Sequence, residues 1–266
     1  MTLPPRILLD RPALSAGLCV TPDPHLLHRL LRVLRLRDGS PVILCGPDGT
    51  TWNGVLARSA GQWFLRADAL QEERGAPGSP PGPPFVLVMG ILKGDRTEWA
   101  IQKATETGVR EVHVAVMRHS VPRPEGPEAR RKVERLRRVA REAARQCGRP
   151  VAPEVHLWPD LPAVMPALDR WKDPVLPRRM LDERPGTPLL AASLRNAPGA
   201  ILASGPEGSF DPEERRLLLE HGFLPAGLGP RILRAETAAM VGLVVAQVVC
   251  GDLGDAVSCS EPEETP

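Results

Sequence analysis

Charged side chains crowd the start of the most apolar helical stretch in the sequence. In GLGPRILRAETAAMVG, residues 227–242, Arg231, Arg234 and Glu236 lie between a glycine-proline turn and a run of apolar residues. Guanidinium and carboxylate groups are costly to take out of water unless a ligand or a countercharge meets them. These three side chains therefore need either a ligand to act on or a partner to pair with.

A second glycine-proline loop has the same form. In LASGPEGSF, residues 202–210, it separates an apolar strand pattern from a helix that Asp211 and Pro212 begin and Gly222 ends. In open α/β sheets, ligands bind outside the carboxyl ends of the strands, where such loops bring bare backbone close. Either loop alone could be a tight turn that only needs glycine. Two of them at one sheet edge favour a ligand pocket.

Other common catalytic motifs are absent from the sequence. It contains no G-x-x-x-x-G-K-[ST], no G-x-G-x-x-G after a strand, no H-E-x-x-H and no G-x-S-x-G, so phosphate hydrolysis, dinucleotide redox chemistry, zinc proteolysis and serine hydrolysis lose their usual support. The five cysteines are scattered without a C-x-x-C pair. We therefore predict neither a disulfide framework nor a metal site.

Residues 130–149 form a strongly basic helical pattern, in which nine arginines and lysines stand against two glutamates. An apolar stripe runs along one side of it: Val133, Leu136, Ala140, Ala143 and Cys147. A charged outer face is ordinary for an amphipathic helix, but an excess of this size favours contact with RNA phosphates.

The elements that must position these residues alternate between strands and helices from residue 85 onward. Strands are predicted at 85–92, 111–117 and 199–205, and helices at 95–108, 127–147 and 236–250. Asp95 with Glu98 is a predicted capping pair, and Gly108 is the predicted end of the first of these helices. Such alternation predicts an α/β fold with a parallel sheet covered on both faces. Between residue 150 and the strand at 199–205, only one short helix and one strand are predicted.

The first 72 residues have a different pattern. Residues 25–37 predict one amphipathic helix, and 40–57 and 61–70 predict short antiparallel strands. The proline- and glycine-rich run EERGAPGSPPGPP that follows predicts a linker. We therefore expect a small β-rich RNA-binding domain at 1–72, a linker at 73–84, an α/β domain at 85–253 and a disordered acidic tail at 254–266.

Composition bounds the remaining possibilities. No run approaches the length of an apolar membrane span, and the first residues do not resemble a signal peptide, so a cytoplasmic protein is expected. The net charge of +2 conceals a basic body, because residues 251–266 are acidic with no basic residue. A basic body suggests a polyanionic partner.

These features resemble the 16S ribosomal RNA uridine N3-methyltransferases, the RsmE family. The resemblance rests on LKGDRTEWAIQKATETGV, AREAARQCGR, LASGPEGSF and LGPRILRAETAA, in this order and spacing, and extends loosely over most of residues 1–253. It implies a PUA-like β-barrel domain followed by a SPOUT-type parallel sheet with a C-terminal trefoil knot. It also implies a homodimer that uses S-adenosylmethionine to methylate uracil N3 in 16S ribosomal RNA, free or in the assembled small subunit.

Position by position, the resemblance implies the residues of the site. The implied cofactor-binding residues are Leu181, Glu183, Gly205, Pro206, Glu207, Gly208, Leu228, Gly229, Pro230, Ile232 and Leu233. The predicted RNA contacts are Arg29, Arg32, Lys93, Arg96, Arg131, Arg135, Arg138, Arg145, Gln146, Arg149 and Arg231. The predicted catalytic residues are Arg234 and Glu236. Two positions depart from the family pattern: Ser209 replaces a glycine, which matters if the loop needs a positive φ there, and Thr107 replaces a leucine.

The implied chemistry assigns tasks to the charged pair. Uracil N3 is a poor nucleophile while it keeps its proton, so the enzyme must orient the base, help to remove the proton and stabilise negative charge on the flanking carbonyl oxygens. We expect Arg234 to stabilise that charge. Glu236 either accepts the proton or fixes Arg234 through a bidentate ion pair, and the second role is favoured because a base needs a raised pKa that a sequence does not reveal.

Two other functions are compatible with the sequence. One is an RNA-binding ribosome-assembly factor with a SPOUT-like fold and decayed catalysis, which Ser209 favours. The other is a small-molecule α/β enzyme whose basic helix is only a solvated surface. Cofactor binding tests the first, and steeply salt-dependent RNA binding would count against the second.

Overall fold

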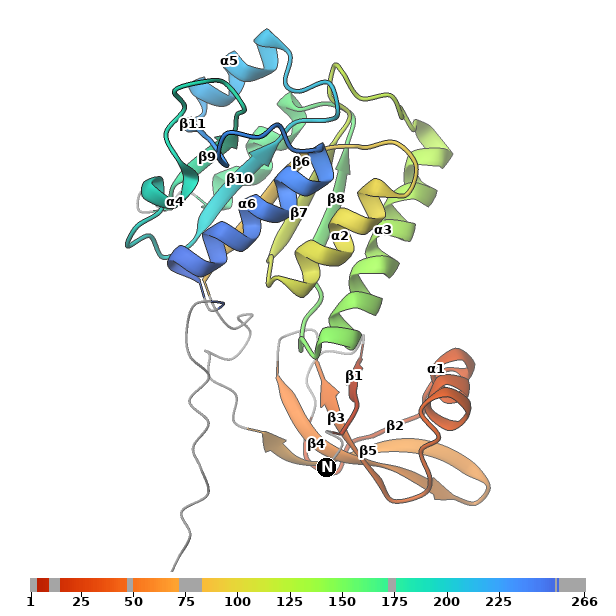
Figure 1. The fold of residues 1–266 in the computed structure, drawn as a ribbon. Coiled ribbons are helices and arrows are strands. Elements are labelled where there is room, and N and C mark those ends of the chain that lie inside the picture. The colour runs from red at the N-terminus through yellow and green to blue at the C-terminus, as the bar shows by residue number, and fades with distance from the viewer. Residues whose placement is uncertain are drawn as a thin grey trace, which may run out of the picture.

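Two sheets organise the chain (Figure 1). The computed structural model describes residues 4–9, 15–46, 50–71, 83–171, 176–251 and 253. Most of the predicted linker and the whole predicted acidic tail therefore lie outside the described residues. In the described part, no helix is long and apolar enough to cross a membrane.

The N-terminal sheet has five strands in the order β1-β3-β4-β5-β2. They are β1 (Arg6–Leu8), β2 (Cys19–Val20), β3 (Ser40–Cys45), β4 (Thr51–Ser59) and β5 (Gln62–Gln71). Ala60 and Gly61 both have positive φ and join β4 to β5 as the two-residue turn that suits the twist of a hairpin. The predicted antiparallel strands are thus confirmed, and β1 and β2 are strands that the sequence did not predict.

The predicted helix over residues 25–37 is shorter and less regular than expected. It consists of α1 (Pro24–His28), capped by Asp23, followed directly by the π-helical turn η1 (Arg29–Val33). Leu30 is fully buried, but Leu34 is 38% exposed and Arg35 has a φ of 53°. The prediction of one long helix was wrong at its end, because the chain turns away once Leu30 has reached the core of this sheet.

The C-terminal sheet is parallel throughout, with six strands in the order β11-β9-β10-β6-β7-β8. They are β6 (Phe85–Gly90), β7 (Glu111–Ala115), β8 (Glu154–Trp158), β9 (Arg178–Leu181), β10 (Ala200–Ser204) and β11 (Phe223–Ala226). Every residue of β6, β7 and β10 is buried. Continuous apolar runs are what a parallel strand covered on both faces requires, so the predicted α/β sheet is confirmed.

Helices cover both faces of this sheet. Figure 1 shows α2 (Arg96–Glu106), α3 (Gly126–Cys147) and α6 (Ala235–Cys250) across one face. The short α4 (Leu190–Ser193) packs against the α6 side, and η2 (Pro162–Trp171) and α5 (Pro212–Glu220) pack on the opposite face. The side chains of β6 alternate between the two cores, with Phe85, Leu87 and Met89 toward α2 and α6 and Val86 and Val88 toward η2.

Beside the six-stranded sheet, the ends of α2 and α5 follow the sequence, apart from the capping pair of α2. Asp211 begins α5, as the sequence indicated, and the structure adds a capping box with Glu214. Gly108, with a φ of 90°, comes directly after the C-cap of α2. The predicted capping pair of α2 was wrong, because the Asp95 side chain makes no capping bond and instead accepts one from Arg135 Nη2 at 3.3 Å.

The basic helix α3 packs through its predicted stripe with one change. Leu136, Ala140 and Ala143 are buried as expected, and Val133 is partly buried. Cys147 is exposed at the last turn, where the neighbouring Ala144 is buried in its place. The C-terminal end of α3 contacts β1, so this helix connects the two sheets (Figure 1).

A polar network joins β7, β8 and η2, with the side chains of Glu111 and His113 buried at its centre. Trp158 Nε1 donates to His113 Nδ1 at 3.1 Å, and His113 Nε2 lies 3.1 Å from Glu111 Oε2. Because Nδ1 accepts, Nε2 carries the proton and donates to Glu111. His156 stacks on His113 at 5.0 Å between ring centroids, and Arg170 of η2 pairs with Glu111 at 2.5 Å. The network fixes η2 to the sheet.

Candidate active site

A pocket of about 350 Å³ opens at the carboxyl ends of β9, β10 and β11. Its lining comes from segments that are far apart in the sequence: Arg96, Leu181, Asp182, Glu183, Ser204, Gly205, Pro206, Glu207, Ser209, Leu228, Gly229, Arg231, Ile232, Leu233, Arg234, Ala235 and Ala238. This is the sheet edge at which open α/β folds bind ligands.

The loop after β10 is held in a compact turn. Ser209 N–H donates to the Pro206 carbonyl at 2.9 Å, and Glu207 Oε1 accepts from the Lys93 N–H at 2.9 Å. A Cβ on Gly90, at the end of β6, would lie 2.7 Å from Pro206 N, so only glycine lets the loop pack this closely on the neighbouring strand. We refer to residues 205–209 as the first pocket loop.

Ser209 has a φ of 61°, in the left-handed region that favours glycine. The position at which the family pattern has glycine therefore does need a positive φ, and serine adopts it here. Thr107, the other departure, lies away from the pocket. Its hydroxyl donates to the Lys103 and Ala104 carbonyls within α2, so the substitution is satisfied locally.

The loop after β11, residues 227–234, forms the opposite wall. Gly227 exchanges backbone hydrogen bonds with Pro188 and Leu190, which fixes the loop beside the segment after β9. Gly229 has a φ of 110°. Arg234 is the N-cap residue of α6 and makes no side-chain capping bond, so the first turn of α6 opens on the pocket with its positive dipole end.

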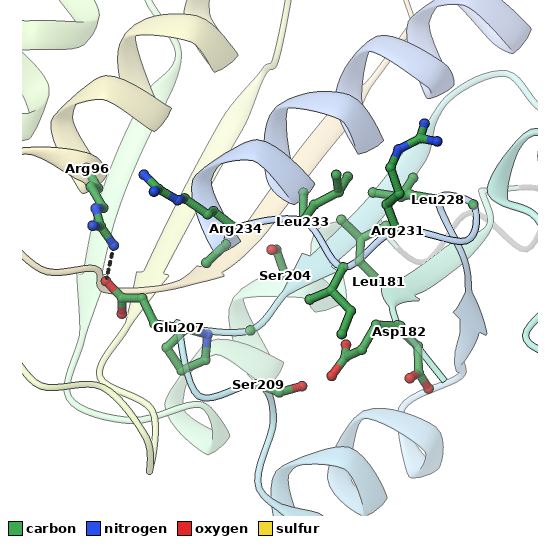
Figure 2. Close-up of a pocket in the computed structure, with 17 residues that line it drawn as sticks. Arg96, Leu181, Asp182, Ser204, Glu207, Ser209, Leu228, Arg231, Leu233 and Arg234 are labelled. Atoms are coloured by element: carbon green, nitrogen blue, oxygen red, sulfur yellow. Dashed lines mark ion pairs between the residues drawn. The ribbon is translucent and has the colours of Figure 1, made fainter. Parts of the chain in front are cut away.

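The arginines at the pocket mouth differ in their partners. Arg96 lies between two carboxylates, with Nη1 3.5 Å from Glu207 Oε1 and Nε 3.7 Å from Glu236 Oε1. Figure 2 shows Arg234 extending toward Arg96, whereas Arg231 extends to the other side. Within the described part of the chain, neither Arg234 nor Arg231 has an ion-pair partner. The Arg234 guanidinium is therefore available to a ligand.

The structure gives Glu236 a different ion-pair partner from the expected one. Its carboxylate pairs with Arg96, and among the described residues no ion pair joins it to Arg234. Glu236 does not line the pocket, and its Oε2 is buried without a hydrogen-bond partner in the described part. The expected bidentate pair was wrong because the side chain of Glu236, on the first turn of α6, is directed toward α2.

The structure brings most of the predicted cofactor residues around the pocket. All but Gly208 and Pro230 are in its lining. Asp182, Ser204 and Ser209 line it as well, although the sequence had not singled them out as cofactor residues. Asp182 is also paired with Arg215 of α5, a contact that no local sequence pattern indicates.

The predicted RNA contacts are spread over the molecule. Arg32, Arg131, Arg138, Gln146 and Lys93 are exposed, and Arg231 is exposed at the pocket. Arg29, Arg145 and Arg149 are partly buried, and Arg149 Nη1 donates to the Thr105 carbonyl at 2.8 Å. Arg135 is engaged by Glu98 and Asp95 at 3.1 and 3.3 Å, and Arg96 belongs to the pocket. In the described ranges, no cluster of His, Cys, Asp or Glu could hold a metal ion.

Known proteins share this fold and this site region. A family model described as RNA methyltransferase domain matches residues 80–247. The ribosomal RNA small subunit methyltransferase E of Bacillus subtilis is 29% identical, covering 81% of this chain and 84% of its own length. The Mycobacterium tuberculosis protein of the same name is 31% identical, covering 79% of each.

Two solved structures match nearly the whole chain. A methyltransferase from Legionella pneumophila, solved with bound S-adenosylmethionine, has a TM-score of 0.80 and 27% identity, covering 94% of this chain and 100% of that chain. A ribosomal RNA small subunit methyltransferase E from Neisseria gonorrhoeae has a TM-score of 0.79 and 24% identity, covering 94% and 99%; at this identity the likeness shows the fold.

A parallel sheet with a loop-lined pocket at its carboxyl edge, together with the family match over most of that sheet, defines an RNA methyltransferase. The relatives narrow this class. The chain belongs to the ribosomal RNA small subunit methyltransferase E family.

Proposed function

We propose that this enzyme methylates N3 of a uridine in small-subunit ribosomal RNA, with S-adenosylmethionine as the methyl donor. The observation that carries the proposal is the pocket: two glycine-proline loops meet around one cavity, and Arg234 stands unpaired at its mouth among the described residues. The names of the relatives indicate ribosomal RNA as the substrate, and the Legionella structure, solved with bound S-adenosylmethionine, indicates the cofactor. We place the enzyme in the cytoplasm, in the maturation of ribosomal RNA.

The residues present fit this cofactor. A volume of about 350 Å³ lies within the usual range for small-molecule pockets. A Cβ on Gly205 would lie 3.0 Å from Phe210 N, so the absence of a side chain there keeps the first pocket loop compact and its backbone open to a ligand. Leu181, Leu228 and Leu233 offer apolar walls, and the carboxylates of Asp182 and Glu183 offer acceptors for hydroxyl groups.

Arg234 has the central role in this proposal. S-adenosylmethionine supplies an electrophilic methyl group when bound. The Arg234 guanidinium, without a carboxylate partner in the described part of the chain, can donate to a uracil carbonyl oxygen and stabilise the negative charge that grows when N3 loses its proton. The N-terminal end of α6 adds positive potential at the same place. Glu236, held by Arg96 behind the pocket wall, acts in positioning.

Replacement of Arg234 tests this assignment. We expect Arg234→Ala to lower kcat about 10²- to 10³-fold, the usual cost of removing a preorganised donor at an oxyanion, while the Kd for S-adenosylmethionine stays within about twofold. Calorimetry and single-turnover methylation measure the two quantities separately. Near-normal turnover with intact cofactor binding would show that the assignment is wrong.

Ribosomal RNA from a deletion strain tests the reaction itself. We expect N3-methyluridine to be missing from its small-subunit RNA by nucleoside mass spectrometry and to return with the wild-type gene. Persistence of the modified nucleoside would contradict the proposed product. The alternative of an assembly factor with decayed catalysis predicts no heat of S-adenosylmethionine binding in calorimetry.

We further propose the finer architecture that the family resemblance implies. Residues 1–72 would form a PUA-like RNA-binding barrel, joined by a linker at 73–84 to a SPOUT domain at 85–253, with an acidic tail at 254–266. The five-stranded sheet supports the first unit. The bridge between Leu189 and Gly227 supports a C-terminal trefoil knot, because it lays the last loop alongside the segment after β9.

A homodimer is part of the same proposal. Along α6, Val244 and Val248 are 36% and 55% exposed, and Met240, one turn earlier on the same side, is partly buried. Residues at this spacing share one helix face, so α6 presents an apolar stripe that a second copy would cover. Light scattering tests it: the wild-type enzyme should have twice the monomer mass, and Val248→Glu should shift it toward the monomer.

A further inference from the structure

His119 lies directly behind the first pocket loop. Its Nδ1 is 3.0 Å from the Gly208 carbonyl and 3.2 Å from the Ser209 carbonyl. A carbonyl oxygen only accepts, so Nδ1 carries the proton and donates to this pair. One imidazole therefore binds two successive carbonyls of the turn that contains Ser209.

The ring also accounts for the glycine at position 208. Gly208 has no positive φ, yet a Cβ there would lie 2.8 Å from His119 Cβ. Glycine is thus required by the close approach of His119, whereas position 209 is under backbone strain because serine adopts a φ of 61°. His119 therefore packs against Gly208 and donates a hydrogen bond to the carbonyls of both Gly208 and Ser209.

The segment that carries His119 is itself fixed. Ser120 Oγ accepts from Met117 N–H at 3.1 Å, and Arg118 N–H donates to Glu214 Oε1 at 2.7 Å. Arg123 Nη2 donates to the Arg118 carbonyl at 2.7 Å. The turn after β7 is thereby connected to the capping box of α5, which begins directly after the first pocket loop. The backbone on both sides of His119 is consequently held in place by these hydrogen bonds.

We propose that His119 is a positioning residue for cofactor binding: it holds residues 206–209 in the conformation that binds S-adenosylmethionine and offsets the strain of serine at position 209. This inference rests on the proposed function, because it assigns the first pocket loop to the cofactor. His119 is absent from the pocket lining, so it acts through the loop.

The decisive variants are His119→Ala and His119→Asn. Loss of the hydrogen bonds in His119→Ala should raise the Kd for S-adenosylmethionine by about three- to tenfold. The KM for this cofactor should rise in parallel, with the KM for RNA unchanged. The amide nitrogen of asparagine can take the place of Nδ1, so His119→Asn should return the Kd to within about twofold of the wild-type value.

A matched control removes the same type of bond elsewhere. His221 Nδ1 lies 2.9 Å from the Leu217 carbonyl at the end of α5, away from the pocket. His221→Ala should leave the Kd for the cofactor unchanged. A general loss of stability would move both alanine variants, whereas positioning of the loop moves only His119→Ala.

Ser209→Gly tests the link to backbone strain. Glycine adopts a positive φ without cost, so the His119→Ala loss should be smaller in the Ser209→Gly background than in the wild-type background. An equal loss in both backgrounds, or an unchanged Kd in His119→Ala, would overturn the inference. If the wild-type enzyme gave no heat with S-adenosylmethionine, the proposed function itself would fail, which is a distinguishable result.

Discussion

Arg96 shows at the scale of single residues how one guanidinium can connect two parts of a site. It joins Glu207 of the first pocket loop to Glu236 of α6, and both carboxylates are less exposed than the arginine. Arg96 was predicted as an RNA contact because the sequence reveals its charge but not its two ion-pair partners. Glu207 and Glu236 are far along the chain from it and are brought close only by the parallel sheet.

Removal of this connection should weaken the cofactor site moderately. Exposed ion pairs contribute about 0.2–1 kcal/mol, so we expect Arg96→Ala to raise the Kd for S-adenosylmethionine about two- to fivefold. Isothermal titration measures it. Lys103→Ala is the control, because it removes a pair with Glu106 within the same helix; an Arg96→Ala variant that matched this control would contradict the positioning role.

The polar network at β7 and β8 makes stability depend on pH. Burial lowers the pKa of His156 below its ordinary 6.5, and the neighbouring His113 lowers it further, against an opposing effect of Glu154. The unfolded chain then binds a proton that the folded chain resists. The contribution of His156 to stability is therefore fully present above its ordinary pKa and is lost as the pH falls below that value.

We expect the Tm of the wild-type protein to fall more between about pH 7.5 and pH 5.5 than that of His156→Gln. Thermal unfolding followed by circular dichroism measures it. Glu111 should contribute little in this window, because hydrogen bonds from His113 and Arg170 hold its pKa below the ordinary value despite burial, which acts to raise it. His25→Gln, an exposed change on α1, is the control; equal pH profiles for wild type and His156→Gln would refute the prediction.

At the scale of elements, the packing of α6 couples the helix to the pocket. A Cβ on Gly242 would lie 2.9 Å from Leu181 Cδ1, and Leu181 lines the pocket. Gly242→Val should destabilise the protein by about 1–3 kcal/mol through overpacking and should also lower cofactor affinity by displacing Leu181. Denaturant titration and calorimetry measure these effects.

Gly242→Ala provides a graded comparison. Its single methyl group still meets the flexible end of Leu181, but alanine is favoured over glycine in a helix by about 1 kcal/mol. We therefore expect a nearly neutral free energy of unfolding together with a smaller loss of affinity. Equal affinity in all three proteins would show that Leu181 yields without entering the pocket.

Most elements could be predicted from local patterns. The apolar runs of β6 and β10 and the caps of α5 follow from residue type and spacing alone. Between residue 150 and β10 only one short helix and one strand were predicted, whereas the structure has the strands β8 and β9, η2 and the short α4. The pattern was hard to predict there because η2 is a 3-10 helix with Pro166 inside it and lacks a regular period. The two loops of the site could be predicted to face a ligand, whereas His119 carries no local signal and is linked to them only through the fold.

At the scale of the whole molecule, positive charge lies on the outer side of α3. Arg131 and Arg138 are exposed there, and the described part of the chain gives neither an ion-pair partner. Arg135, between them in the sequence, is neutralised by Asp95 and Glu98. The helix therefore offers fewer free charges to RNA than its sequence suggests, and these two are the ones to remove.

We expect Arg131→Ala with Arg138→Ala to weaken RNA binding and to make the slope of log K against log salt shallower by about 1 to 2. The reason is that binding releases fewer counterions when the protein contacts fewer phosphates. Fluorescence anisotropy across a salt series measures it. The control is Arg195→Ala with Arg216→Ala, which makes the same charge change at exposed positions near the other edge of the sheet. Equal slopes for the two double variants would exclude α3 as the RNA surface.

The residues that line the pocket are synthesised at widely separated times, because they extend from Arg96 to Ala238 along the chain. One wall includes Arg96, at the start of α2, and the last residues to complete the lining are those from Leu228 to Ala238. Contacts between segments this far apart form late. The N-terminal sheet and β6 to β8 are therefore synthesised before the residues that complete the pocket. The chain can bind the methyl donor only after α6 has left the ribosome and packed against the sheet.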